Sequence, residues 1–416
     1  MKYVLIIADG VSDLPVPELD GRTPLEAART PNLDALAAGG RVGTVSMAGP
    51  PDEAALASAL AIAGVDLAPL LETTDLSPAA IEAFAETQAT WANILRVDFF
   101  ALNAAEAVHF EPLDAPARPA SDAFRGLVRD LEAWWREREP EAMTEWTVDP
   151  FAEGRALLVN RTMQEFGEPG LFEPQEASRR PWREHFEGQG SRRTFAARLI
   201  EHSATFFAER NRGSLDPHPP ALAWIWDPGF IASLLKRPQS PVSGLAFVRD
   251  PHLVAAAKFI GWDLAPAAPD VTSDLRALAV AIGQALRSHD LIVCEVDGAR
   301  EASLRGDWQA KVEAIEAIDR DLIGPVRSDV ERFGNPEHAP GETGWRMLVL
   351  PRRSAHLSTR TLMYEPVPFV MAGAWVRSVV QRAFSERDGA ASDLHIEAGH
   401  ELLEYFLRSG LARTRA

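Results

Sequence analysis

The stretch that most constrains the fold of this chain is the apolar run Tyr3–Ala8, which ends at Asp9 and Gly10. A run that is apolar on both faces and rich in β-branched residues is typical of a central strand covered by helices on each side. Ligands of open α/β sheets bind beyond the carboxyl ends of such strands, where Asp9 lies and where Gly10 permits a sharp turn. Asp9 is therefore either a site residue or a cap on the next element.

Composition sets the broad class. The chain has 416 residues, of which 46% are hydrophobic and 25% charged, which is enough for a large core and two domains. A net charge of −18 and the lack of a long apolar run argue against nucleic acid or a membrane as a partner. A single cysteine, Cys294, excludes an internal disulfide, and the first strand leaves no room for a signal peptide. We therefore expect a cytoplasmic protein.

Strand and helix patterns alternate along most of the chain. The predicted strands are 3–8, 42–46, 94–102, 107–110, 157–160, 221–226, 244–248, 291–296, 346–350 and 367–371. The predicted helices are 51–64, 78–90, 121–138, 194–209, 253–260, 273–288, 307–323 and 400–407. This alternation predicts an α/β protein with a doubly wound, mostly parallel sheet.

Two shorter helices follow the first strand and carry start signals. Thr23 stands at the N-cap position, Pro24 at the first helical position and Glu26 three residues after Thr23, which predicts a capping box. Thr30 and Pro31 repeat the signal at the start of a second helix, which we expect to end at Gly39-Gly40.

The opening of the chain resembles that of the cofactor-independent (2,3-bisphosphoglycerate-independent) phosphoglycerate mutases, most closely the archaeal type. The similar stretches are Asp9-Gly10, Gly21–Asp34, Gly40–Gly43, Lys311–Asp319, Ser358–Thr361, Glu365–Phe369, Phe384–Arg387 and Gly399–Leu403. This resemblance implies an alkaline-phosphatase-like core with an inserted α+β cap domain. On this basis we expect the core at residues 1–72 and 218–416 and the cap at 73–217.

The resemblance also implies a reaction in which a serine accepts a phosphoryl group beside two divalent metals. Asp9 matches the first metal ligand of the family. The position of the nucleophile falls on Ala55, and Ser58 lies one turn further along the predicted helix. We expect the Ser58 hydroxyl to bond its own helix backbone, which leaves it a weak candidate for the nucleophile.

The remaining ligand positions are largely substituted. Asp297 matches the Asp of the family's second pair, but its partner four residues later is Glu301, which can still bind Mn²⁺ or Mg²⁺. The family's adjacent Asp-His pair falls on Arg352 and Arg353. The last histidine ligand is replaced by leucine, and nearby His356 either stands in for it or is simply solvated.

Two groups of arginines have two interpretations each. Arg352 and Arg353 either bind an anion, such as phosphate or a carboxylate, or form ion pairs with Asp9 and Asp297. A second cluster, which includes Arg179, Arg180 and Arg183, either holds the substrate as cap arginines do in the family or is a solvated basic loop. The nearby acids of such a loop are Glu173, Glu176, Glu184 and Glu187.

The leading hypothesis is a divergent relative of the mutases that lacks the dinuclear metal site and the serine nucleophile. Such a protein would be catalytically silent, or repurposed to bind a small phosphorylated metabolite, a protein partner or a second copy of itself, with no metal cofactor. The alternative is an active mutase or phosphatase that uses Mn²⁺, Zn²⁺ or Mg²⁺ on Asp9, Asp297 and Glu301. A third hypothesis is a subunit of an assembly.

Overall fold

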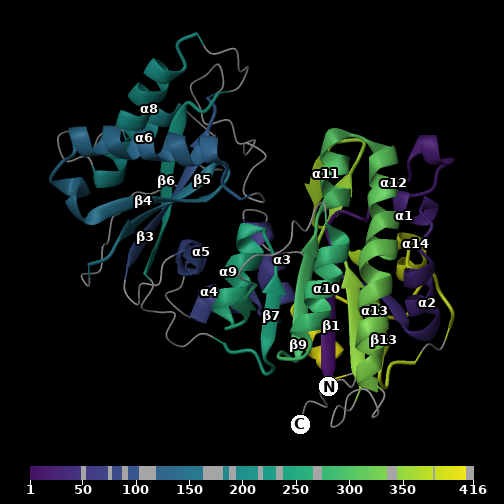
Figure 1. Ribbon diagram of the computed structural model, residues 1–416. Helices are drawn as coiled ribbons and strands as arrows, with labels where there is room; N and C mark the ends of the chain where they lie inside the picture. Colours follow the sequence, from purple (N-terminus) through teal and green to yellow (C-terminus); the bar gives the residue numbers. More distant parts are fainter. Residues whose placement is uncertain are drawn as a thin grey trace. The chain divides into compact units, whose positions relative to one another are not determined.

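The chain folds into two compact units (Figure 1). The computed structural model describes residues 1–47, 53–73, 77–86, 92–102, 119–162, 181–186, 194–213, 219–230, 238–265, 274–334, 344–377 and 380–408. The first unit comprises Met1–Ala68, Pro238–Val248 and Ala256–Ala416, and the second comprises Pro69–Arg237 and Arg249–Ala255. The second unit is thus inserted into the sequence of the first. The unit boundaries fall within α4 (Leu67–Thr73) and within or near α9 (Pro251–Phe259).

An eight-stranded sheet forms the centre of the first unit, with the strand order β14-β2-β13-β10-β1-β9-β7-β8. β1 (Lys2–Ala8) lies between β9 (Leu291–Val296) and β10 (Trp345–Leu350) and is parallel to both. β13 (Val367–Gly373) is antiparallel to both of its neighbours. The other strands are β2 (Arg41–Val45), β7 (Gly244–Phe247), β8 (Asp263–Leu264) and β14 (His395–Ile396).

The register of the central strands brings distant parts of the sequence together. Ala8 pairs with Val296 and Ile7 pairs with Leu350. The residues that follow these strands, Asp9 and Asp297 among them, therefore lie side by side at the carboxyl edge of the sheet. Beyond this edge, β11 (Ser354–His356) and β12 (Thr361–Met363) form a two-stranded sheet of their own.

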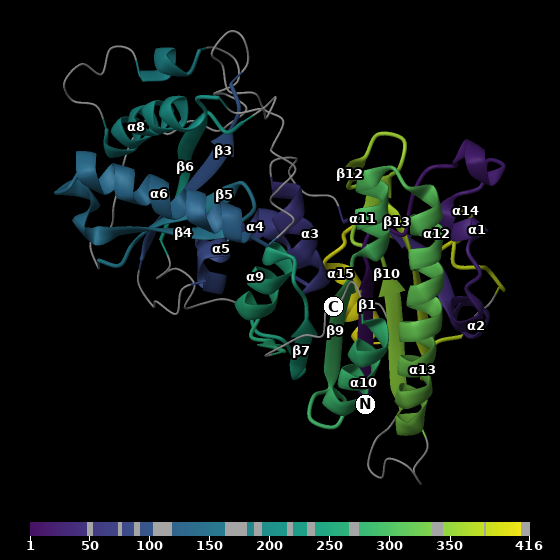
Figure 2. The same ribbon diagram turned by 45° about the horizontal axis from the view of Figure 1, so that its top comes forward.

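Successive residues of β1 point to opposite faces of the sheet and are apolar on each, so both faces are covered by helices. Val4, Ile6 and Ala8 belong to a core shared with α2 (Pro31–Gly39) and α10 (Leu275–Ala285). Figure 2 shows α12 and α13 end to end beside β10. On the other face, the ring of Tyr3 lies 5.5 Å from that of Phe406. Further helices of this unit are η1 (Pro17–Leu19), α1 (Pro24–Ala27), α3 (Ala54–Ile62), α11 (Gly298–Arg305), α12 (Trp308–Ala317), η7 (Ile318–Ile323), α13 (Gly324–Glu331), η8 (Arg332–Gly334), α14 (Glu386–Ala390) and α15 (Glu401–Leu407).

The second unit is built on a four-stranded antiparallel sheet with the order β4-β5-β3-β6. Its strands are β3 (Asn93–Phe100), β4 (Trp146–Ala152), β5 (Arg155–Asn160) and β6 (Leu222–Phe230). Helices α6 (Asp122–Arg138) and α8 (Phe195–Arg210) pack on this sheet through a core that contains Trp135, Phe207 and Trp224. Helix α5 (Pro78–Glu86) packs against β3 and β6.

The predicted fold class is confirmed: the structure is α/β, with a large and mostly parallel sheet. Two predictions differ from the structure, and several elements were not predicted. The expected core segment 218–416 begins with β6, which pairs instead with β3 in the second unit. The single helix expected at 307–323 continues to residue 331 and contains the π-helical segment η7. Helix α11 and strands β4, β8, β11, β12 and β14 were not expected.

One predicted strand, 107–110, lies outside the described residues. In the described part of the chain, every helix is too short or too polar to cross a membrane.

Candidate functional site

Asp9 lies at the carboxyl end of β1 and is completely buried. Its backbone N–H donates to the carbonyl of Val296, which fixes it beside β9. Arg353 follows the other neighbour, β10, and donates to Asp9 Oδ2 from Nε at 3.2 Å and from Nη2 at 3.1 Å. Its Nη1 donates to the Tyr364 hydroxyl at 2.9 Å. The predicted ion pair between Arg353 and Asp9 is therefore present.

A second guanidinium, that of Arg300, reaches the same carboxylate from the first turn of α11. Its Nη1 donates to Asp9 Oδ2 at 3.3 Å, and its Nη2 donates to Asp297 Oδ2 at 2.7 Å. Burial alone would lower the pKa of this guanidinium, but Asp9 and the neighbouring carboxylates raise it above the ordinary value. Arg300 is therefore charged at every physiological pH.

These contacts decide whether the site can hold a divalent metal. A metal on Oδ2 of Asp9 would have to lie about 2.0–2.2 Å from that oxygen, in the space on which the two guanidinium groups converge. A divalent ion about 4 Å from each guanidinium would be repelled by roughly 8 kcal/mol per pair at an effective dielectric constant near 20. Among the described residues, no three His, Cys, Asp or Glu side chains are grouped as a metal site would require. The residues present do not fit a metal pair.

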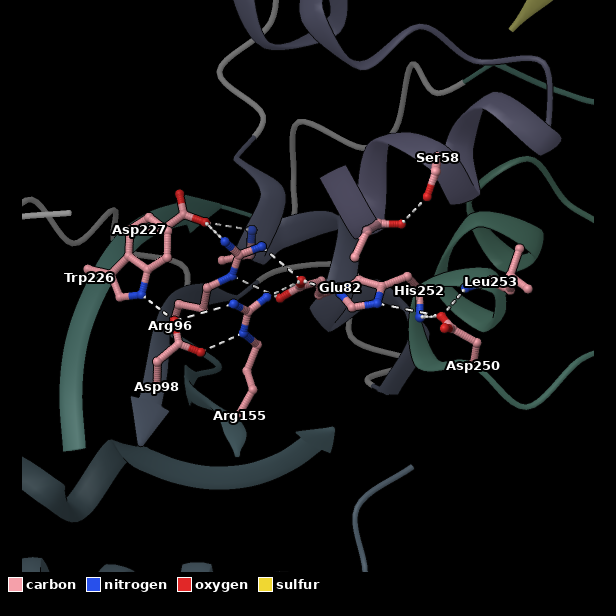
Figure 3. A network of polar contacts seen from close by, with 12 residues as sticks. Ser58, Glu82, Arg96, Asp98, Arg155, Trp226, Asp227, Asp250, His252 and Leu253 are labelled. Carbon is pink, nitrogen blue, oxygen red and sulfur yellow. Dashed lines mark hydrogen bonds and ion pairs between the residues drawn. The ribbon is translucent and has the colours of Figure 1, made fainter. Parts of the chain in front are cut away.

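Ser58, the weak candidate for the nucleophile, bonds its own helix backbone, as we expected. Ser58 is buried in α3, and its hydroxyl donates to the backbone carbonyl of Ala55 at 3.0 Å, as Figure 3 shows. The same carbonyl accepts a bond from Nη1 of Arg352 at 3.5 Å. Ser58 and Arg352 therefore both contact the helix backbone at the position where the resemblance places the nucleophile.

Of the other predicted site residues, Glu301 joins Asp9 and Asp297 around Arg300, whereas His356 and Arg183 make separate contacts. Glu301 accepts from Arg300 Nη2 at 3.3 Å. His356 faces Glu365, with 2.8 Å between Nε2 and Oε1. Arg183 belongs to the second unit, where it is exposed and stacks on Trp182 at 4.2 Å from the ring centroid. Arg179 and Arg180 lie outside the described residues.

Sequence reasoning missed two residues of this site. Arg300 was not singled out, and Glu295, which lies within the apolar run of β9, was treated only as part of a strand. Two signals were present in the sequence. A carboxylate inside a strand that is buried on both faces needs a partner, and Arg300 follows Asp297 by three residues, one helical turn.

The second unit contains a separate polar cluster, drawn in Figure 3. Glu82 of α5 accepts from Arg96 Nε at 3.0 Å, from Arg96 Nη2 at 2.8 Å and from Arg155 Nη1 at 3.0 Å. Arg155 Nε also donates to Asp98 at 2.6 Å, and the indole N–H of Trp226 donates to the same carboxylate at 2.7 Å. All five side chains are buried. The cluster joins α5 to β3, β5 and β6.

The charged side chains of this cluster are paired with one another. His252 Nε2 lies 3.3 Å from Glu82 Oε1, and Asp227 Oδ2 lies 3.5 Å from Arg96 Nη1. Burial alone would raise the pKa of Glu82, but Arg96, Arg155 and His252 overcome this and hold it well below its usual value. A carboxylate held this strongly by the chain's own cations acts as a structural ion-pair centre.

The fold defines the chain as an α/β protein with a large, mostly parallel sheet and an inserted second unit built on an antiparallel sheet. No family model matches the chain. Its relatives are 2,3-bisphosphoglycerate-independent phosphoglycerate mutases. One from Methanothrix thermoacetophila is 25% identical over 98% of this chain and 100% of its own length. A probable mutase from Geobacter sulfurreducens is 26% identical over the same shares.

Solved structures agree on the fold. A protein from Pyrococcus horikoshii superposes with a TM-score of 0.66 and 21% identity over 100% of this chain and 99% of its own. A cofactor-independent phosphoglycerate mutase from Thermoplasma acidophilum superposes with a TM-score of 0.52 and 19% identity over 99% and 100%. The resemblance inferred from the sequence is thereby confirmed over nearly the whole chain.

Proposed function

We propose that this chain is a divergent phosphoglycerate-mutase-like protein that carries out no metal-dependent phosphoryl transfer. The observation that supports the proposal most directly is the pairing of the buried Asp9 carboxylate with both Arg353 and Arg300. Phosphoryl transfer of the kind implied by the relatives needs a nucleophile and cations that neutralise the transferring oxygens. Here the nucleophile position is Ala55, and the carboxylates that would hold those cations are paired with arginines.

The charge of the site also bears on the ligand. Four carboxylates, those of Asp9, Glu295, Asp297 and Glu301, contact the guanidinium of Arg300, and Asp9 also contacts that of Arg353. In the described part of the chain, both of these guanidinium groups are thus already engaged by carboxylates, which argues against phosphate binding by them. If the chain binds a small phosphorylated metabolite, we place that binding on the arginines of the second unit, which include Arg179, Arg180 and Arg183.

A direct assay distinguishes our proposal from the alternative, which is a mutase or phosphatase with one metal on Asp9, Asp297 and Glu301. The purified full-length chain is incubated with MnCl₂, ZnCl₂ or MgCl₂ and tested for mutase turnover on 3-phosphoglycerate and for hydrolysis of p-nitrophenyl phosphate. The mutase from Methanothrix thermoacetophila is the positive control. We expect no turnover above the blank, together with a bound metal content well below one ion per chain.

A variant sharpens the test. Ala55→Ser restores a hydroxyl at the nucleophile position and leaves every arginine unsubstituted. We expect this variant to remain inactive. Turnover of the unmodified chain in the range of about 1–10³ s⁻¹ that is typical of enzymes would overturn the proposal. Light scattering on the same preparation measures whether the chain forms a homo-oligomer, and thermal shifts with 3-phosphoglycerate measure metabolite binding.

A further inference from the structure

A pocket of about 440 Å³ lies at the end of the central sheet opposite to Asp9. It is lined by the start of β10, the end of β13, the C-terminal part of α2 and the second half of α13, all of which belong to the first unit. Trp345 in its lining pairs with Lys2 at the start of β1, whereas Asp9 follows the last residue of that strand. The volume is within the range of about 300–1,000 Å³ that is typical of small-molecule sites.

Small residues keep the pocket open. Gly39 is the last residue of α2, and a Cβ on it would meet nothing within 4 Å. Its φ is not positive, so neither the backbone nor a neighbour requires a glycine at this position. The next residue differs, because a Cβ on Gly40 would clash with the carbonyl oxygen of Met371. Gly39 therefore contributes open space to a wall of the pocket that also contains Ala35 and Ala372.

Two side chains give the pocket its chemistry. Nε of Arg327 donates to Oε1 of Glu331 at 2.8 Å, one turn further along α13. The other two guanidinium nitrogens, Nη1 and Nη2, make no hydrogen bond to any residue that the structure describes, and the side chain is 31% exposed. The indole of Trp345 is partly buried against the core of the unit. The pocket thus combines a charged pair of donors with a flat aromatic surface.

We propose that this pocket binds a small aromatic monocarboxylate. A guanidinium binds a carboxylate through two parallel hydrogen bonds, and Nη1 and Nη2 of Arg327 provide that pair of donors. The ring of the ligand packs against the indole of Trp345 and the small residues of α2 and β13, which removes apolar surface from water. Glu331 selects against a phosphate, because its negative charge beside Arg327 repels a dianion more than a monoanion. Binding here is independent of whether the carboxyl end of the sheet holds a metal.

The test is calorimetric titration of the full-length chain with 2-naphthoate, a flat bicyclic acid. We expect a Kd of about 1 mM or tighter, which is typical of a ligand with so few atoms. The amide 2-naphthamide keeps the shape and lacks the charge, and 2-naphthyl phosphate carries a second negative charge. Both should bind at least about tenfold more weakly, because each makes a poorer partner for Arg327 beside Glu331. Binding of either compound as tightly as 2-naphthoate would show that the assigned ligand class is wrong.

A substitution of Arg327 tests the carboxylate contact. Arg327→Gln removes the pair of donors and should weaken 2-naphthoate binding at least about tenfold, since a hydrogen-bonded charge is lost. The matched control is Arg320→Gln. Arg320 belongs to η7, which precedes α13 in the same helical run, and its side chain is 62% exposed and does not line the pocket. The control should bind as the unmodified chain does.

A substitution of Gly39 tests the space. A leucine there has room at its Cβ and extends into the pocket, so Gly39→Leu should keep the Tm of the unmodified chain and lose 2-naphthoate binding. Gly39→Ala adds a single methyl group and should retain binding. If the unmodified chain does not bind millimolar 2-naphthoate, or if either Arg327→Gln or folded Gly39→Leu binds it equally tightly, the proposal is wrong. Should Gly39→Leu fail to fold, Arg327→Gln, which changes a partly exposed side chain, decides alone.

Discussion

Asp9 and Gly10 illustrate how far a single position can be predicted. The apolar run before them placed both at the end of a central strand, and the structure confirms that position. The sequence did not predict that Gly10 lies against Arg300, because the two are 290 residues apart. Tertiary packing decides which helix crosses the end of a strand. The local sequence around Gly10 or around Arg300 does not indicate it. The same reason left Arg300 out of the predicted site.

Gly10→Ala tests this close approach. Gly10 and Gly21 share a φ of 75°, but a Cβ on Gly21 would meet nothing within 4 Å. Gly21→Ala should therefore lower the free energy of unfolding only by the cost of an alanine in the left-handed conformation, about 1–2 kcal/mol. Gly10→Ala should lower it by at least a further 1–3 kcal/mol, which is typical of overpacking in a core. Urea denaturation of both variants measures the difference, and equal losses would show that the contact with Arg300 is unimportant.

At the scale of elements, helix starts were predicted unevenly. The capping box of Thr23 and Glu26 is present, with both of its hydrogen bonds. Thr30 carries the same signal before α2, yet its side chain makes no capping bond. Asp319 of η7 takes this role from across the fold, since Oδ1 accepts from the N–H of Leu33 at 2.7 Å and Oδ2 from that of Asn32 at 3.2 Å. A cap supplied from a distant segment leaves no pattern in the local sequence.

This capping role gives a testable difference. Asp319 is completely buried, so Asp319→Ala leaves two backbone donors at the start of α2 without their acceptor. We expect a loss of about 1–3 kcal/mol in the free energy of unfolding. Thr30→Val removes only a hydroxyl that caps nothing and should stay within about 0.5 kcal/mol. Equilibrium unfolding followed by circular dichroism measures both, and a larger loss for Thr30→Val would reverse the assignment.

The polar cluster of the second unit links four elements through Glu82, and its charge makes it sensitive to acid. The folded-state pKa of Glu82 lies below its ordinary value of 4.5. Its stabilising effect is therefore present above pH 4.5 and is lost as the pH falls below that value. Glu82→Gln should be less stable at pH 7, and its stability should fall less steeply in acid.

The measurement is the urea midpoint at a series of pH values from 7 downward. Glu137→Gln is the matched control, since Glu137 lies on α6 of the same unit with a side chain that is 76% exposed. We expect the control to follow the unmodified chain at every pH. Parallel pH curves for Glu82→Gln and the unmodified chain would mean that Glu82 does not contribute to acid sensitivity.

At the scale of the whole molecule, the sequence predicted the fold better than the division between its units. Apolar runs such as Leu291–Val296 identify buried strands because burial on both faces requires them. The strand now called β6 has the same kind of apolar pattern, and nothing local tells which of two sheets it joins. Pairing with β3 is a property of the assembled second unit, so the boundary placed at 217/218 missed it.

Each unit has its own apolar core and its own buried charge cluster. We therefore expect a substitution in one cluster to destabilise only the unit that contains it. Arg300→Ala removes a cation that contacts Asp9, Glu295, Asp297 and Glu301 within the first unit, whereas Glu82→Gln weakens contacts made within the second. Hydrogen exchange followed by mass spectrometry should therefore show faster exchange in β1 and β9 for Arg300→Ala, and in β3 and β5 for Glu82→Gln. In each variant, the peptides of the other unit's sheet serve as the internal control. Breaking a buried ion pair should lower the stability of the unit that contains it by about 3–5 kcal/mol. If both variants instead speed exchange equally in both sheets, the two clusters do not stabilise their units separately.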